Sequence, residues 1–288
     1  MSMDLPLLWH IPLSHFNEKV RWALDFKNIA HRRKRVGGDY LFKAWRATGH
    51  GTLPILLLDG QPIRDSTAII AELEQRYSEP ALYPKDEAQR RRALGLEDYF
   101  DEVLGPSVRA AIISPLFQED PDLALRVLTT GMPDAAYRNL RRLRRVFPAF
   151  YRFRHKIKAR RLQQDRADVA NALDRISREL KPSGYLVGET FSVADLTAAV
   201  LLGALLQPPE LQYPLAVKLP DSLLQYRDDL ERHPAAQWTL EMYRRHRGSS
   251  AEVRRGSAND GSFSEERAQS DGLRFTSKTT REGPGRGM

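Results

Sequence analysis

Residues 51–77 read GTLPILLLDGQPIRDSTAIIAELEQRY, and this stretch decides how the rest of the chain is interpreted. The apolar run from Ile55 to Leu58 is short and is followed by Asp59-Gly60, so it predicts a buried strand that enters a hairpin turn. A second strand is expected from Gln61 to Ile63. The apolar residues after Asp65-Ser66 have helical spacing, and Ser66 is placed to cap the first turn of that helix.

Pro54 stands directly before the first of these strands. Proline donates no hydrogen bond to a sheet, so this position predicts a cis bond and a sharp turn after Leu53. The turn would leave the N–H and C=O of Leu53 free for a peptide-like ligand, and the open amides of the helix after Asp65-Ser66 would attract a carboxylate. The residues alone leave two readings open, a site for a small peptide or an N-capped helix after a hairpin.

The elements expected before residue 51 complete one domain. Residues 5–10 predict a first strand, a helix capped by Ser14 follows and ends near Asn28, residues 31–36 predict a second strand, and residues 40–48 a short helix. The order strand, helix, strand, helix, strand, strand, helix is that of a thioredoxin-like βαβαββα domain. We expect that domain to occupy residues 1–77.

The same residues resemble the glutathione-binding domain of cytosolic glutathione transferases. In that family a Val/Leu-Pro pair with a cis bond contacts the cysteinyl backbone of glutathione, and an acidic-Ser pair at the next helix holds its γ-glutamyl group. Leu53, Pro54, Asp65 and Ser66 occupy those places, and the ALYP sequence at 81–84 resembles the family's exit from this domain. The resemblance implies glutathione as the cosubstrate.

Ser14 is the candidate catalytic residue. A hydroxyl at the start of a helix can donate a hydrogen bond to a bound thiol and, together with the helix dipole, favours the thiolate. In serine-type glutathione transferases the catalytic serine lies six residues before the valine of a KVR-AL signature, and Ser14 stands in that relation to Val20 of KVRWAL. The alternative is that Ser14 only caps the helix. His15 could also reach the cleft.

One position departs from the serine-type pattern. Relatives commonly carry a basic residue before the Val/Leu-Pro pair, which binds the glycyl carboxylate of glutathione, whereas this chain has Thr52. Lys43, Arg46 and His50 are the candidates to supply that charge. The substitution leaves open another thiol peptide as ligand, or a site without catalysis. Trp45 is expected in the core or in the cleft wall.

Composition limits the chemistry. The 288 residues contain no cysteine, which excludes a disulfide, a thiolate zinc site and a cysteine nucleophile, and the proposed reaction needs no metal. The hydrophobic content of 41% is enough for a sizeable core. Without a signal-like start or a membrane-length apolar stretch, a cytoplasmic location is the expectation, and the family resemblance implies a role in detoxification.

Helical patterns dominate after a linker at 78–86, and they predict an all-helical domain over residues 87–247. Residues 86–113 predict one long helix with a kink or break at Gly105-Pro106, ended by Pro115. Tyr99 and Arg109 are candidates for the wall of an apolar pocket between the two domains. Ser192 and Asp195 predict an N-capping box, similar to that of the core helix in the second domain of glutathione transferases.

A basic segment at 134–166 looks like an expansion relative to the family. It predicts a basic amphipathic helix, kinked or interrupted at Pro148. Its acids are Asp134 and Asp165, and its cationic residues comprise Arg138, Arg141, Arg142, Arg144, Arg145, Arg152, Arg154, Lys156, Lys158, Arg160, Arg161 and Arg166. Three interpretations stay open: a solvated bundle face, attraction to anionic lipid or another acidic surface, and attraction to nucleic acid.

Residues 248–288 are rich in Gly, Ser and Arg and show no apolar period, so we expect a disordered tail. The whole pattern predicts a glutathione transferase-like enzyme that binds a small-molecule thiol and an electrophile, and the resemblance implies a homodimer. The alternative is a non-catalytic binding or scaffold protein on the same fold, recruited to acidic surfaces by its basic segment.

Overall fold

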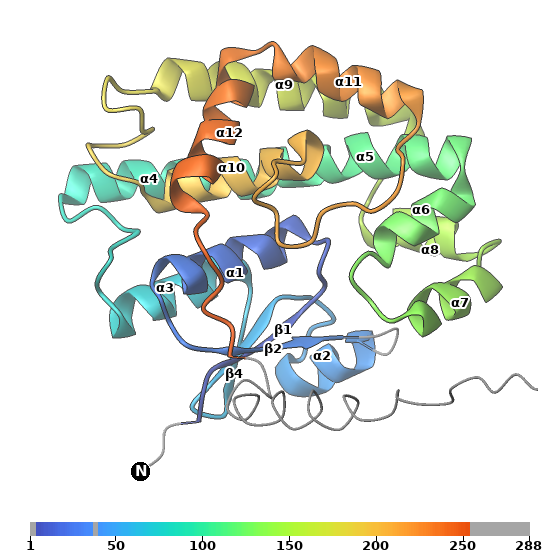
Figure 1. Ribbon diagram of the computed structural model, residues 1–288, viewed down its shortest axis with the longest axis horizontal. Coiled ribbons are helices and arrows are strands. Elements are labelled where there is room, and N and C mark those ends of the chain that lie inside the picture. The colour runs from blue at the N-terminus through green and yellow to red at the C-terminus, as the bar shows by residue number, and fades with distance from the viewer. Residues whose placement is uncertain (1–3, 37–39, 254–288) are drawn as a thin grey trace, which may run out of the picture. The chain divides into compact units, whose positions relative to one another are not determined.

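The computed structural model describes residues 4–36 and 40–253 (Figure 1). Its first seven elements follow the predicted order, with β3 and α2 at the predicted bounds. They are β1 (Leu7–His10), α1 (His15–Phe26), β2 (Arg32–Arg35), α2 (Tyr40–Thr48), β3 (Ile55–Leu58), β4 (Gln61–Arg64) and α3 (Ser66–Arg76).

These strands form one four-stranded sheet in the order β2-β1-β3-β4. Strand β1 pairs parallel to β2 and antiparallel to β3, and β3 pairs antiparallel to β4. Helices α1 and α3 lie on one side of the sheet, and α2 lies on the other (Figure 1). The thioredoxin-like fold is therefore confirmed.

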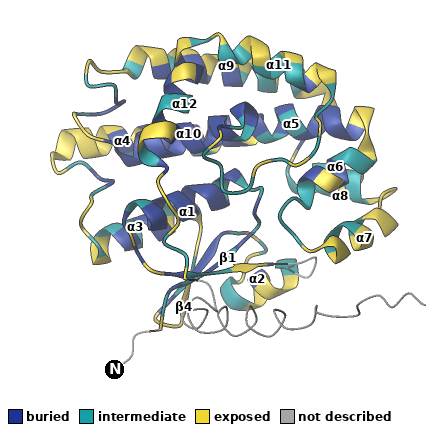
Figure 2. Ribbon diagram, in the orientation of Figure 1, coloured by how far each residue is buried: buried dark blue, intermediate teal, exposed yellow. Residues whose placement is uncertain are grey.

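Helix α1 lies between the sheet and the helical part of the chain, so both sides of it are buried (Figure 2). Trp22 shows why this helix belongs to both parts: its ring stacks on Phe191 with centroids 5.8 Å apart and meets Tyr243 at 4.5 Å. One apolar core consequently runs from Leu8 in β1 to Leu196 in the helical part. Burial of aromatic area on this scale fixes the position of α1.

The helical part is confirmed as a second, all-α region. It consists of α4 (Glu87–Tyr99), the π-helical turn η1 (Phe100–Leu104), α5 (Gly105–Glu119), α6 (Pro121–Leu128), α7 (Asp134–Arg142), α8 (Phe147–Arg154), the 3₁₀ turn η2 (Ala159–Arg161), α9 (Leu162–Glu179), α10 (Val193–Leu206), α11 (Asp221–Glu231) and α12 (Pro234–His246).

The predicted break at Gly105-Pro106 is a change of winding, from the π turn η1 into α5, with Pro106 in the first turn where no N–H is needed. A Cβ on Gly105 would lie 2.7 Å from Cζ of Phe16, so glycine permits α1 and α5 to approach closely. The prediction that Pro115 ends this helix is wrong, because α5 continues to Glu119. Leu116 and Phe117, which follow the proline, are buried, and that packing outweighs one lost backbone hydrogen bond.

The basic segment is not one continuous helix. Residues 143–146 separate α7 from α8, and Pro148 lies in the first turn of α8. Several large apolar side chains of this region face solvent, including Phe153, which is 85% exposed. Trp45 of α2 is 63% exposed, so the expectation of a core or cleft-wall position is wrong.

After α12 the chain returns to the thioredoxin-like part and contacts it beyond residue 248, where the tail was predicted to begin. His31 N–H donates to Ala251 C=O at 3.4 Å, and His31 forms a parallel bridge with Glu252. The compact unit therefore extends to Glu252, a few residues beyond the predicted boundary at 248. Polar contacts hold this stretch, which explains why an apolar pattern could not reveal it. The rest of the predicted tail, residues 254–288, lies outside the described residues.

Within the described residues, no helix combines the length and apolar character needed to cross a bilayer. Those residues also contain no cluster of three or more His, Asp or Glu side chains arranged to hold a metal ion.

Candidate functional site

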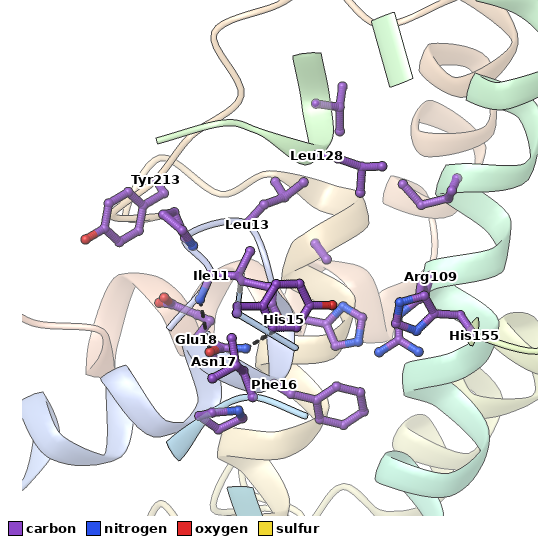
Figure 3. A pocket seen from close by; sticks show the side chains of 18 of the residues that line it. Ile11, Leu13, His15, Phe16, Asn17, Glu18, Arg109, Leu128, His155 and Tyr213 are labelled. Atoms are coloured by element: carbon purple, nitrogen blue, oxygen red, sulfur yellow. Dashed lines mark hydrogen bonds between the residues drawn. The ribbon is translucent and has the colours of Figure 1, made fainter. Parts of the chain in front are cut away.

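A cavity of about 770 Å³ opens where β1, α1 and the turns beside β3 and α3 meet helices α5 to α8. Its volume is in the range of small-molecule sites. The structure brings five predicted residues to its wall: Ser14, Leu53, Pro54, Asp65 and Ser66. Figure 3 shows side chains of α1 and of the helical part pointing toward one another across it.

Ser14 occupies the N-cap position of α1, but its side chain makes no capping hydrogen bond. Asn17 Nδ2 instead donates to Ser14 Oγ at 2.7 Å, while Asn17 Oδ1 accepts from Ile11 N–H at 3.2 Å. The second bond fixes which end of the amide faces the serine. Among the described residues nothing accepts a hydrogen bond from the Ser14 hydroxyl, so its proton is available to a ligand.

The peptide bond between Leu53 and Pro54 is cis, in the place where the sequence predicted it. On the neighbouring turn Asp65, rather than Ser66, caps α3: its carboxylate accepts from Thr67 N–H at 3.0 Å and Ala68 N–H at 3.3 Å. Asp65 has φ 73°, a left-handed conformation that only a few non-glycine residues adopt. Ser66 is buried at the cavity wall and has no side-chain partner among the described residues.

The three candidates for the glycyl carboxylate, Lys43, Arg46 and His50, are exposed and do not line the cavity. A different cation reaches this end of the site. Arg154 of α8 lines the cavity and donates through Nη2 to the C=O of Gly51, the residue before Thr52. The basic segment thus places a guanidinium at Gly51, directly before Thr52.

The helical wall of the cavity carries Arg109, as the sequence predicted, together with Tyr151 and His155. Burial and the neighbouring Arg109 and Arg154 lower the pKa of His155 to about 3. Burial, Arg109 and His155 also lower the pKa of His15. Burial raises the pKa of Tyr151 to about 12, so its phenol stays protonated. Tyr99 does not line the cavity; its ring contacts Arg175 instead.

Ser192 and Asp195 form a capping box at the start of α10. The Asp195 carboxylate accepts from Leu186 N–H at 2.8 Å and Ser192 N–H at 2.9 Å, away from the cavity. Burial raises the pKa of Asp195 to about 6, against the effect of these hydrogen bonds.

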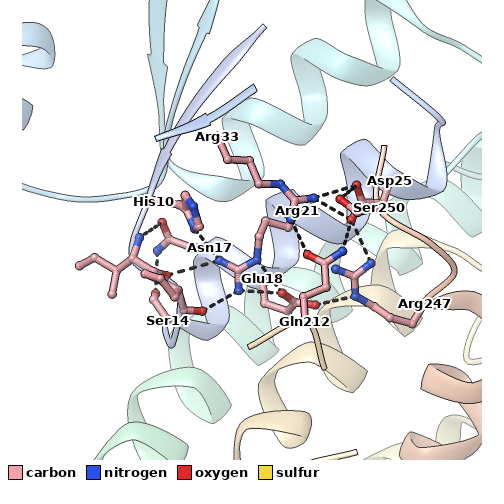
Figure 4. Close-up of polar contacts among 12 residues, drawn as sticks. His10, Ser14, Asn17, Glu18, Arg21, Asp25, Arg33, Gln212, Arg247 and Ser250 are labelled. Atoms are coloured by element: carbon pink, nitrogen blue, oxygen red, sulfur yellow. Dashed lines mark hydrogen bonds and ion pairs between the residues drawn. The ribbon is translucent and has the colours of Figure 1, made fainter. Parts of the chain in front are cut away.

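A buried ion network runs along α1 from Glu18 in its first turn to Asp25 near its end (Figure 4). Glu18 accepts from Arg21 at 2.7 Å and from Arg247 at 2.6 Å. Asp25 accepts from Arg33 at 2.8 Å and from Arg247 at 3.1 Å. Arg247, just after α12, therefore joins the end of the helical part to the helix that carries Ser14.

Sequence reasoning missed Asn17, Arg154 and Arg247. Asn17 follows Ser14 by three residues, and that spacing could have indicated contact within one helical turn. Arg154 and Arg247 act across 103 and 229 residues of sequence, to Gly51 and Glu18, so no local pattern could find them.

The fold defines a two-domain protein with a thioredoxin-like half and a helical half. Residues 8–81 match the family model "Glutathione S-transferase, N-terminal domain", and residues 158–237 match "Glutathione S-transferase, C-terminal domain". The chain belongs to the glutathione transferase-like family. The α5–α8 region, including the basic segment up to residue 157, falls between the two matched ranges.

Individual relatives are distant. A "Probable glutathione S-transferase" from Nicotiana tabacum is 21% identical over 192 residues, which are 66% of this chain and 65% of that protein. The chain thus spans slightly less than two thirds of that relative's length. A "Maleylacetoacetate isomerase" from Pseudomonas aeruginosa is 32% identical over 98 residues, 33% of this chain and 46% of that protein.

Among solved structures, a glutathione S-transferase from Methylobacillus flagellatus kt with gsh bound is similar with a TM-score of 0.57. It is 19% identical, and the similarity covers 86% of this chain and all of that one. This comparison supports the fold.

Proposed function

We propose that the protein binds glutathione across Leu53-Pro54 and Asp65-Ser66 and activates its thiol for attack on an electrophile in the cavity. The observation that carries the proposal is the Ser14 hydroxyl, which accepts from Asn17 and keeps its own proton for a ligand at the cavity wall. The bound glutathione of the Methylobacillus flagellatus structure supports the choice of thiol.

The step needs no nucleophile from the protein. The thiol gives its proton to water, and Ser14 remains protonated and donates a hydrogen bond to the sulfur. The amides at the N-terminus of α1 add a positive potential, which favours the thiolate by roughly 0.3–1 kcal/mol. The sulfur lone pair then forms the carbon–sulfur bond, and the leaving group departs with the electron pair of the broken bond.

Arg154 takes the role that the sequence assigned to Lys43 or His50. Its guanidinium is beside Gly51 and Thr52, where the glycyl carboxylate of glutathione would lie. A cytoplasmic, dimeric detoxification enzyme is the setting that the family resemblance implies for this activity.

The test is a conjugation assay with glutathione and an aryl halide. Ser14→Ala should lower kcat/KM by about 100-fold, the size expected for losing one hydrogen-bond donor to developing or stabilised anionic charge. Ser14→Gly separates activation from the helix start, since glycine is well tolerated at an N-cap but offers the sulfur no side-chain donor. Ser78→Ala, an exposed serine in the linker, is the matched control and should leave turnover unchanged.

The scaffold alternative predicts a different outcome. If calorimetry detects no binding of glutathione to the folded wild-type protein, the enzymatic proposal is wrong and the non-catalytic reading takes its place. Loss of activity in Ser14→Ala but not in Ser14→Gly would show that Ser14 acts only through the helix start.

A further inference from the structure

Arg109 is a partly buried cation on α5 without an acidic partner. The described residues offer it no carboxylate and no hydrogen-bond acceptor; its electrostatic neighbours are Tyr151, Tyr40 and another cation, Arg154. Its guanidinium lies over the ring of Phe16, 5.5 Å from the centroid. Figure 3 shows Arg109 facing His15 and His155 across the cavity.

The fully buried lysines and arginines of the described chain are paired with acids. Lys19 lies 2.7 Å from Glu97, and Lys27 lies 2.6 Å from Glu74. An unpaired buried charge is costly, and folding normally compensates it with a counter-charge. At Arg109 the compensation is left to whatever occupies the cavity.

The acids that line the cavity are engaged elsewhere or exposed. Glu18 is bound by Arg21 and Arg247, Asp65 caps α3, and Asp101 lies 2.6 Å from Lys19. The fourth, Glu102, is exposed to solvent. The wall around Arg109 is therefore basic.

Two imidazoles add hydrogen-bonding capacity beside the guanidinium. His15 is 8% exposed, and its Nε2 has no partner among the described residues. The lowered pKa values of His15 and His155 keep both rings neutral at pH 7, and a neutral ring has one N–H to donate. A carboxylate at Arg109 could accept from the guanidinium fork and from these rings together.

The position of Arg109 indicates that it contacts the electrophilic second substrate rather than glutathione. Glutathione would place its carboxylates at Asp65-Ser66 and beside Arg154. Arg109 instead contacts Phe16, two residues beyond Ser14, on the helical side of the thiol. The remaining wall on that side is apolar, including Leu140 and Phe147.

We propose that this cavity selects electrophiles that carry a carboxylate, held by Arg109 and flanked by His15 and His155. The inference rests on the proposed function, because it names the class of electrophile that the glutathione thiolate attacks. An apolar body would pack against the α5–α8 wall while its carboxylate is bound at Arg109.

The test compares two electrophiles of one shape. 4-Chloro-3-nitrobenzoate and 4-chloro-3-nitrobenzamide differ in charge, and each can displace the neutral fluorophore N-phenyl-1-naphthylamine from the full-length protein without glutathione. We expect the benzoate to displace it at an about tenfold lower concentration, as for one charge-assisted hydrogen-bonded pair. Equal midpoints in the wild-type protein overturn the proposal without any variant.

Variants then locate the preference. In Arg109→Gln the benzoate and benzamide midpoints should differ by no more than about twofold, with the benzamide midpoint unchanged. Arg109→Lys should keep part of the preference for the benzoate. Arg145→Gln, an exposed arginine outside the cavity, is the control and should keep all of it. A preference that survives Arg109→Gln with a normal melting temperature overturns the assignment.

Glutathione calorimetry separates this proposal from the proposed function. Arg109→Gln should bind glutathione as the wild-type protein does. If it loses glutathione affinity and the benzoate preference stays, Arg109 belongs to the glutathione site and the proposal is wrong. If no glutathione binds at all but the benzoate preference depends on Arg109, the proposed function fails while the anion site stands.

With glutathione present, conjugation replaces the aryl carbon–chlorine bond by a carbon–sulfur bond and releases chloride.

Discussion

Two groups of basic side chains flank helix α1, and they differ in what faces them. In the network of Figure 4, Arg21, Arg33 and Arg247 share Glu18 and Asp25, and every guanidinium has a carboxylate within 3.1 Å. At the cavity, Arg109 and Arg154 face no acid among the described residues. Paired cations hold the helix in place, whereas unpaired cations define what the cavity can accept.

The pKa values express the same difference. Burial by itself raises the pKa of Asp25, but Arg33 and Arg247 lower it below the ordinary value. At the cavity no acid offsets burial, and the pKa of Arg109 is lowered. In the network Glu18 and Asp25 raise the pKa of Arg247 against the effect of burial, although burial still lowers the pKa of Arg21.

The largest effect is expected from breaking the paired group. Asp25→Asn leaves Arg33 without a carboxylate and Arg247 with Glu18 alone, and removing one partner of a buried ion pair costs about 3–5 kcal/mol. The free energy of unfolding, measured by denaturant titration, should fall by that amount. A loss below about 1 kcal/mol would contradict the structural role of the network.

The next prediction concerns His10, which contacts Arg21 of the paired group, and it is tested by the pH dependence of stability. Burial and Arg21 lower the pKa of His10 to about 2, and Arg21 donates to its Nδ1 at 2.9 Å. Between pH 6.5 and 2 the unfolded state binds a proton that the folded state refuses, so stability is full above pH 6.5 and falls as the pH drops.

The expected slope for His10 is about 1.4 kcal/mol per pH unit. Asp195, with its raised pKa, works in the opposite direction between about pH 4 and 6, so the difference between wild type and His10→Gln is the quantity to measure. Unfolding at pH 7, 6 and 5 should show a shallower slope in His10→Gln. Identical slopes would contradict a buried neutral His10.

The smallest effect is expected at the cavity. Arg109→Gln removes a cation that has no partner, so the free energy of unfolding should change by less than about 0.5 kcal/mol or increase. Denaturant titration beside Asp25→Asn gives the comparison directly. Equal destabilisation by the two variants would mean that Arg109 is a structural residue.

The sequence predicted the thioredoxin-like half well because its signals are local. Ile55–Leu58 and Asp59-Gly60 mark a strand and a turn, and the structure places β3 and the β3–β4 turn there. Pro54 likewise stands at a cis bond. Five of the candidate site residues could be predicted from the sequence for the same reason, because they lie at strand ends and helix starts, which local patterns mark.

Tertiary packing decided what the sequence could not show. Pro115 was expected to end a helix, but buried contacts carry α5 to Glu119. Residues 134–166 were expected to form an amphipathic helix kinked or interrupted at Pro148, and they divide further, into α7, α8, η2 and the start of α9. Arg154 reaches Gly51 only because this region folds back over the cavity.

The most direct test of the account is the ionisation of glutathione bound to the protein, followed by ultraviolet difference absorbance of the thiolate as a function of pH. The account predicts that the bound thiol titrates at least about one pH unit below the usual thiol value of about 8.5, and that Ser14→Ala removes most of this shift. A bound thiol that titrates like free glutathione in the wild-type protein would contradict activation by Ser14.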